Sequence, residues 1–128
     1  MGLFSSLFNR PPKPGRPEPV FADSFQSDVL ESPLPVVVDF WSATCAPCQV
    51  MGGLLNEIGP SLAGRLRILK LNISDAPEIA MQFGVQSVPT LIAFSQGQIV
   101  DRIVGLLPLQ PLQDRLEQIA KRHAQPNT

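Results

Sequence analysis

Short apolar runs alternate with amphipathic stretches along most of the chain. Residues 36–41 form a continuous apolar run rich in β-branched residues, which predicts a strand buried on both faces. Residues 66–73 predict a second strand, and residues 90–94 and 99–104 predict two more, joined by a polar segment typical of a hairpin. With a short edge strand at residues 20–22, the pattern indicates a sheet of about five strands.

The stretches between these strands predict helices over residues 23–31, 45–58, 75–84 and 110–123. Two of these helices open on the pattern of a capping box, in which two side chains bond to free N–H groups of the first turn. The pairs are Asp23 with Gln26 and Asp75 with Glu78. The alternation of strands and helices indicates an α/β fold.

A proline-rich segment at residues 11–19 should be an extended, semi-rigid linker. Before it, Leu3, Phe4, Leu7 and Phe8 have a spacing that favours either a short amphipathic helix or a frayed tail. The alternatives for residues 1–9 are therefore no contact, or a weak contact with a membrane or a partner. The predicted division is a flexible tail with its linker (1–19), a folded domain (20–124) and a flexible C-terminus (125–128).

The chain has 128 residues with 10 basic and 11 acidic side chains, which suits one globular domain. A nucleic-acid-binding protein needs a clustered basic face, so we expect no nucleic-acid partner. The sequence shows no convincing secretory signal and no apolar run long enough to span a bilayer. We therefore expect a cytoplasmic protein, and a monomer.

Both cysteines lie in the window Cys45-Ala46-Pro47-Cys48. A structural disulfide stabilises a fold by closing a long loop, and this pair closes almost none. Redox chemistry and metal binding are the remaining interpretations. Structural zinc normally needs four ligands, and the single histidine, His123, lies far away on the last predicted helix. We therefore expect redox chemistry and no metal.

The junction between a buried strand and a helix favours the thiolate form of Cys45, because a helix N-terminus stabilises negative charge. Cys48 lies one turn further along and faces the same side. We expect Cys45 to be the more exposed sulfur and to attack a substrate disulfide. The more buried Cys48 should then attack Cys45 and release the reduced substrate. Pro47 fits the first helical turn, where no N–H is required.

Asp39 is the one charged residue in the apolar run that leads to Cys45. Burial penalises a carboxylate, which should raise its pKa and suit it to proton exchange near neutral pH. We expect Asp39 to take the proton of Cys48, with Lys70 on the neighbouring strand as its charge partner. The alternative is a solvated or purely structural aspartate.

The cysteines end the sequence VVVDFWSATCAPC, which resembles the active-site strand and turn of the thioredoxin family. Further along, KLNISDAPEIAMQFGVQSVPTLIAF resembles the middle of that fold, and SQGQIVDRIVG resembles its terminal hairpin. The resemblance implies a thioredoxin fold, a central mixed sheet of about five strands flanked by about four helices. It also implies reduction of protein disulfides through Cys45 and Cys48, with no cofactor besides that pair.

The resemblance further implies a surface that binds the substrate. Val88 and Pro89 match the family's cis-proline segment, whose backbone would pair with an extended substrate. Gly105 matches a glycine that lets the substrate chain approach. The residues implied for this surface are Trp41, Thr44, Ala46, Pro47, Val88, Pro89 and Gly105. Disulfide-containing proteins are the implied substrates, and a thioredoxin reductase is the implied electron donor.

Three positions depart from the family's pattern. Ala46 replaces a glycine, Thr44 replaces a tryptophan before the first cysteine, and Gly53 replaces a proline that kinks the helix. Next to Gly52, Gly53 should give the helix a bend or a weak turn. None of these departures removes the catalytic logic. A second hypothesis is a binding or assembly module that keeps the fold without turnover and uses its proline-rich N-terminal tail to reach a partner.

Overall fold

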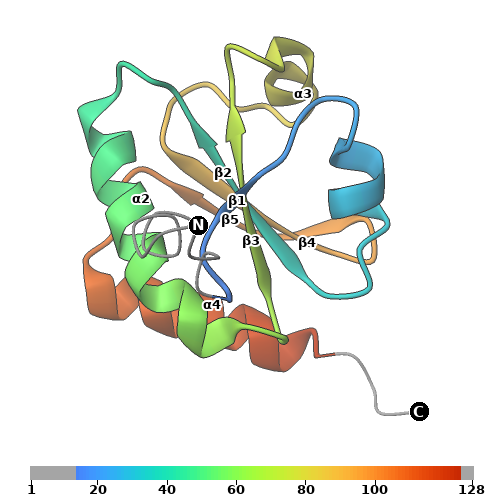
Figure 1. The fold of residues 1–128 in the computed structure, drawn as a ribbon, viewed down its shortest axis with the longest axis vertical. Coiled ribbons are helices and arrows are strands. Elements are labelled where there is room, and N and C mark those ends of the chain that lie inside the picture. The colour runs from blue at the N-terminus through green and yellow to red at the C-terminus, as the bar shows by residue number, and fades with distance from the viewer. Residues whose placement is uncertain (1–13, 125–128) are drawn as a thin grey trace, which may run out of the picture.

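The structure is a computed structural model, and it describes residues 14–124. A five-stranded mixed sheet in the order β1-β3-β2-β4-β5 lies at its centre (Figure 1). β1, β3 and β2 run parallel, β4 runs antiparallel to β2, and β5 runs antiparallel to β4. The bounds are Glu18–Pro19 (β1), Val36–Trp41 (β2), Arg67–Asn72 (β3), Thr90–Ser95 (β4) and Gln98–Val104 (β5). The predicted mixed sheet is confirmed.

Helices cover both faces of this sheet (Figure 1). On one face, Leu55 and Leu116 pack with Val37 of β2, and on the other, Ile79 packs with Phe40. Because successive strand residues point to opposite faces, the continuous apolar run of β2 supplies both clusters. The helices are α2 (Ala46–Ile58) and α4 (Leu109–Arg122) on the first face, a π-helix η1 (Gln26–Leu30) and α3 (Pro77–Gln82) on the second, and a 3₁₀ turn η2 (Gly59–Leu62) after α2.

The edge strand is displaced from its predicted position. β1 is Glu18–Pro19 rather than residues 20–22, so the predicted linker cannot extend to Pro19. An edge strand tolerates proline where the missing N–H faces away from its neighbour. Val20 donates its N–H to the carbonyl oxygen of Lys70 at 2.9 Å, and the preceding Pro19 therefore faces outward. Three segments lie outside the described residues: the short amphipathic pattern at residues 2–9, the first part of the linker at residues 11–13, and residues 125–128.

Neither predicted capping box forms. The residue before η1 is Phe25, and the Oγ of Ser24 instead accepts from the N–H of Phe21 at 3.1 Å. The residue before α3 is Ala76, without a side-chain cap, and the Oδ1 of Asn72 accepts from a neighbouring turn N–H at 2.9 Å. Ser and Asn side chains bond readily to turn backbone, which competes with helix caps. These turns leave helices that are shorter than predicted.

The end of α3 delivers the chain to the edge of the sheet that carries the cysteines. Gly84 has φ +68°, a conformation that L side chains rarely adopt. Its N–H donates to the carbonyl of Met81 at 3.1 Å, and the N–H of Val85 donates to that of Ala80 at 2.8 Å. This pair of bonds is a Schellman motif, which ends the helix at the predicted glycine.

The predicted hairpin between β4 and β5 is confirmed. Its two central residues, Gln96 and Gly97, have φ values of 51° and 77°, as a type I′ turn requires.

Among residues 14–124, no helix combines the length and the apolar character that crossing a membrane requires.

The two glycines inside α2 do not interrupt it, because the helix is continuous from Ala46 to Ile58. A Cβ added at Gly53 would meet nothing within 4 Å. Gly53→Ala should therefore raise the free energy of unfolding by about 0.5 to 1 kcal/mol, since alanine loses less backbone entropy on folding. Urea unfolding of the oxidised protein measures the change. Gly84→Ala is the matched control and should destabilise the fold, and equal effects of both changes would refute this account.

Candidate active site

The two sulfurs lie at the junction between the end of β2 and the start of α2. Cys45 is the N-cap residue of α2, and it forms a disulfide with Cys48 across a Cα–Cα distance of 5.2 Å. The N–H of Cys48 points at the Sγ of Cys45 at 3.1 Å. This free N–H and the positive end of the helix dipole would both stabilise a thiolate at Cys45 once the disulfide is reduced.

The local sequence explains this geometry. β2 ends at Trp41, and Pro47 occupies the first turn of α2, where its missing N–H costs no hydrogen bond. Cys45 is half-buried, whereas Cys48 is only 4% exposed because it lies on the core side of the helix. Thr44, Ala46 and Pro47 are exposed beside the disulfide. A reagent can therefore reach Cys45 far more easily than Cys48.

Asp39 lies in the sheet behind the disulfide. Its side chain shares the face of Val37, the face that α2 covers, because the two residues are two positions apart on β2. The residue is 3% exposed, and its Oδ1 has no hydrogen-bond partner. Burial raises the pKa of Asp39 to about 7, opposed by the positive charge of Lys70, its register neighbour on β3. The carboxyl group therefore changes charge near neutral pH.

A loop between α3 and β4 faces the disulfide from the other side. The Val88–Pro89 peptide bond is cis, as the family resemblance implied. The carbonyl oxygen of Val88 lies 3.8 Å from the Sγ of Cys45. The Oγ1 of Thr90 donates to the carbonyl of Ser87 at 2.8 Å and closes the loop. The backbone of Val88 is thus held beside the more exposed of the two sulfurs.

Gly105 borders the same loop. Its N–H donates to the carbonyl of Pro89 at 2.9 Å, and it has φ +86°. A Cβ added there would meet nothing within 4 Å, so the space above the glycine is open. Trp41 is half-buried, and its Nε1 is a buried donor without a partner.

Two further side chains at this edge were not predicted from the sequence. Val104 and Leu106 flank Gly105 and are 64% and 43% exposed. In the sequence they are indistinguishable from buried strand and loop residues, because their exposure depends on how β5 ends against the Pro89 loop. The only available signal was their position on either side of a glycine.

The metal interpretation finds no support in residues 14–124. No three His, Cys, Asp or Glu side chains gather there in a way that could hold a metal ion. His123 is the C-cap residue of α4, at the far end of the molecule from the cysteines. Its position suits the negative end of the helix dipole.

Comparison with known proteins agrees with this geometry. A family model for thioredoxin matches residues 17–118. The chain belongs to the thioredoxin family. It is 44% identical over 94 residues to a thioredoxin of Synechocystis sp., covering 73% of this chain and 88% of that protein. It is 39% identical to thioredoxin 1 of Nostoc sp. with the same coverage, and 41% identical to a thioredoxin of Rickettsia felis over 71% of this chain and 87% of that one.

Family membership and the Cys45–Cys48 disulfide together define the activity. The chain is a thiol-disulfide oxidoreductase that acts on protein disulfides, and its redox centre is that cysteine pair. The hypothesis of a binding module without turnover is not favoured.

Asp39→Asn tests the buried carboxyl group in the oxidised protein. Burial raises the pKa of Asp39 from 3.8 to about 7, so its stabilising proton is lost as the pH rises through this window. The free energy of unfolding should therefore fall by roughly 3 kcal/mol between about pH 5 and about pH 9 from this group alone. The asparagine variant should lack this fall. Denaturant unfolding at both pH values measures this fall in the free energy of unfolding. An equal fall in the two proteins would contradict the raised pKa of Asp39.

Proposed function

We propose that this chain reduces protein disulfides with Cys45 as the attacking and Cys48 as the resolving residue. The Cys45 thiolate attacks one sulfur of the substrate disulfide, a mixed disulfide forms, and the first substrate sulfur leaves as a thiolate. The Cys48 thiolate then attacks the Sγ of Cys45, and the second substrate sulfur leaves. Two electrons pass to the substrate, and the Cys45–Cys48 disulfide remains.

The difference in exposure between the sulfurs is the observation that carries this order of events. A half-buried Cys45 at the helix N-terminus can meet a protein substrate, whereas Cys48 at 4% exposure cannot. Cys48 can reach the Sγ of Cys45, because the two residues already form a disulfide. An exchange that starts at Cys48 would need the helix to open.

Asp39 supports the second step as a proton acceptor. Cys48 must lose its proton before it can attack, and a thiol buried in the protein cannot give that proton directly to bulk water. A carboxyl group whose pKa is about 7 can take up the proton near neutral pH and release it afterwards. The charge of Lys70 keeps part of the Asp39 population ionised and ready to accept.

The loop that carries Val88 supports the binding of an extended substrate segment. Its carbonyl beside Cys45 offers a backbone hydrogen-bond acceptor, which fits addition of a substrate strand. The exposed residues Thr44, Ala46 and Pro47 adjoin the same disulfide, and the open space at Gly105 lets a chain approach. We include Trp41, the last residue of β2, in this surface because of the family resemblance. The exposed Val104 and Leu106 would add apolar contact area.

The physiological setting follows from the family. The relatives are thioredoxins, which supports a thioredoxin reductase as electron donor and reduction of substrates as the net direction. We place the protein in the cytoplasm as a monomer without nucleic-acid partners.

Two single-cysteine variants test the assigned roles. Cys48→Ser should accumulate mixed disulfides with oxidised substrate proteins, because the resolving sulfur is gone while the attacking sulfur remains. Cys45→Ser should accumulate none. Non-reducing gel electrophoresis after acid quenching measures the adducts, and insulin reduction with dithiothreitol should fall to background in both variants.

Wild-type protein is the control for both variants. Adducts that form at Cys48 rather than Cys45 would reverse the roles. Wild-type insulin reduction no faster than that of Cys45→Ser would refute turnover and favour the binding module instead.

A further inference from the structure

The loop between α3 and β4, residues 83–89, is held by β5 at both of its ends. Downstream, the N–H of Gly105, the residue after β5, donates to the carbonyl of Pro89 at 2.9 Å. Upstream, the Nη2 of Arg102 donates to the carbonyl of Phe83 at 2.6 Å. Val88, whose carbonyl lies beside the Sγ of Cys45, is therefore placed between these two contacts.

The upstream contact completes the end of α3. The N–H groups of residues 83–85 donate to the carbonyls of residues 79–81, and Arg102 supplies a donor for the carbonyl of Phe83, the C-cap residue. Arginine side chains commonly bond the last carbonyls of a helix. A hydrogen bond from a charged guanidinium is also shorter and stronger than one between neutral groups.

No carboxylate of the described chain competes for this guanidinium. Two salt bridges are recorded among residues 14–124, and neither involves Arg102. Its neighbour Asp101 bonds instead to Arg115 of α4, at 2.7 Å and 2.8 Å. Successive residues of a strand point to opposite faces, so Asp101 lies on the face that α4 covers and Arg102 on the face of α3.

The middle of the loop has little packing of its own. The ring of Phe83 contacts those of Phe25 and Phe94, with centroids 5.5 Å and 5.3 Å apart, so its side chain is fixed in the core. Residues 86–87, by contrast, are exposed. The bond from the arginine fixes the peptide group of Phe83, from which the loop continues toward Val88.

We propose that Arg102 is a positioning residue for the reduction of protein substrates. By fixing the upstream end of the loop, it keeps the backbone of Val88 in the conformation that pairs with an extended substrate segment. This role rests on the proposed function, in which that backbone binds the substrate. Arg102 touches no reacting atom, so it acts on the binding of a protein substrate and not on the exchange between sulfurs.

Arg102→Met tests this role, because it removes the donor and keeps an unbranched apolar stem. A loop that is in its binding conformation only about a third of the time lowers the apparent affinity about threefold. The KM for insulin, measured with dithiothreitol as reductant, should therefore rise about threefold or more at little change in kcat. The rate of the first thionitrobenzoate release from DTNB should stay at the wild-type value, since this small disulfide has no chain to pair with the loop. Both assays are run at high salt, which screens exposed charges.

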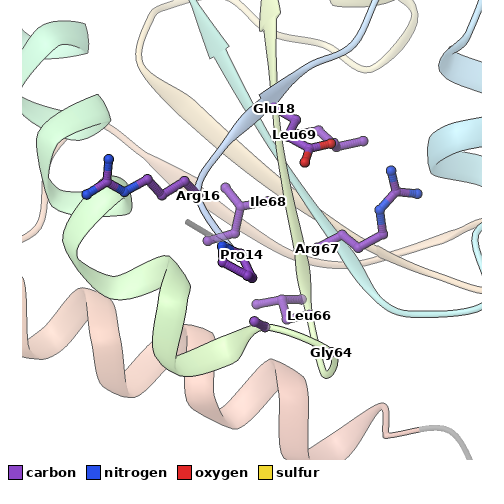
Figure 2. A pocket seen from close by; sticks show the side chains of 10 residues that line it. Pro14, Arg16, Glu18, Gly64, Leu66, Arg67, Ile68 and Leu69 are labelled. Carbon is purple, nitrogen blue, oxygen red and sulfur yellow. The ribbon is translucent and has the colours of Figure 1, made fainter. Parts of the chain in front are cut away.

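Arg67→Met is the matched control. The Nη1 of Arg67 donates to the carbonyl of Asp28 in η1 at 3.2 Å, so this arginine also joins a strand to the backbone of a helix. Figure 2, a view of the pocket beside β3, shows its side chain extending from that strand toward η1. Arg67 pairs with Val36, at the end of β2 remote from Cys45. The control should therefore change neither the KM for insulin nor the rate with DTNB.

Amide hydrogen exchange reports on the loop itself. The N–H groups of Gly84 and Val85 end α3, and their exchange should become about threefold faster or more in Arg102→Met and stay unchanged in Arg67→Met. Unchanged exchange in Arg102→Met would show that its guanidinium does not hold the loop, and would overturn the proposal.

The kinetic outcomes separate this proposal from the proposed function. A wild-type KM in Arg102→Met, an equal rise in both methionine variants, or a parallel loss with insulin and DTNB would each overturn the role of Arg102 and leave the proposed function standing. Wild-type insulin reduction no faster than that of Cys45→Ser would remove the proposed function, and the role of Arg102 with it.

Discussion

The burial of one carboxyl group, Asp39, is the constraint on which the proposed mechanism depends. The sheet removes this group from water and leaves its Oδ1 without a hydrogen-bond partner. An unpaired buried charge is costly, so the group is held near its neutral form and its pKa rises to about 7. The fold bears this cost on the strand that leads to the cysteines, at the residue that we propose accepts the proton of Cys48.

The sheet arranges the remaining parts around that position. The end of β2 delivers Cys45 to the start of α2, and β4 begins directly after Val88 and Pro89. β2 and β4 are antiparallel neighbours, so the end of one strand meets the start of the other and the Val88 carbonyl comes within 3.8 Å of Cys45. At one edge of the same sheet, β1 pairs with β3, and the backbone of Gly15 lies against that of Gly59.

Much of this was predictable from sequence, because it rests on long or strongly patterned segments. The apolar run of β2, the cysteine pair and the buried Asp39 were all recognised from residues adjacent in the chain. The capping boxes failed because Ser24 and Asn72 form competing turns, which local motifs do not rank. The contact of Gly15 with Gly59 depends on tertiary packing, and no local pattern reports it.

The release of the second product from a mixed disulfide tests the coupling between Asp39 and Cys48 most directly. Reduced protein attacks the aromatic disulfide DTNB through Cys45, and the second thionitrobenzoate leaves only when Cys48 attacks. For wild type, the rate of this second release should rise with pH around an inflection near about 7, where the Asp39 carboxyl group ionises. Asp39→Asn should lack that inflection and release the second product more slowly at neutral pH. Identical pH profiles for the two proteins would contradict the account.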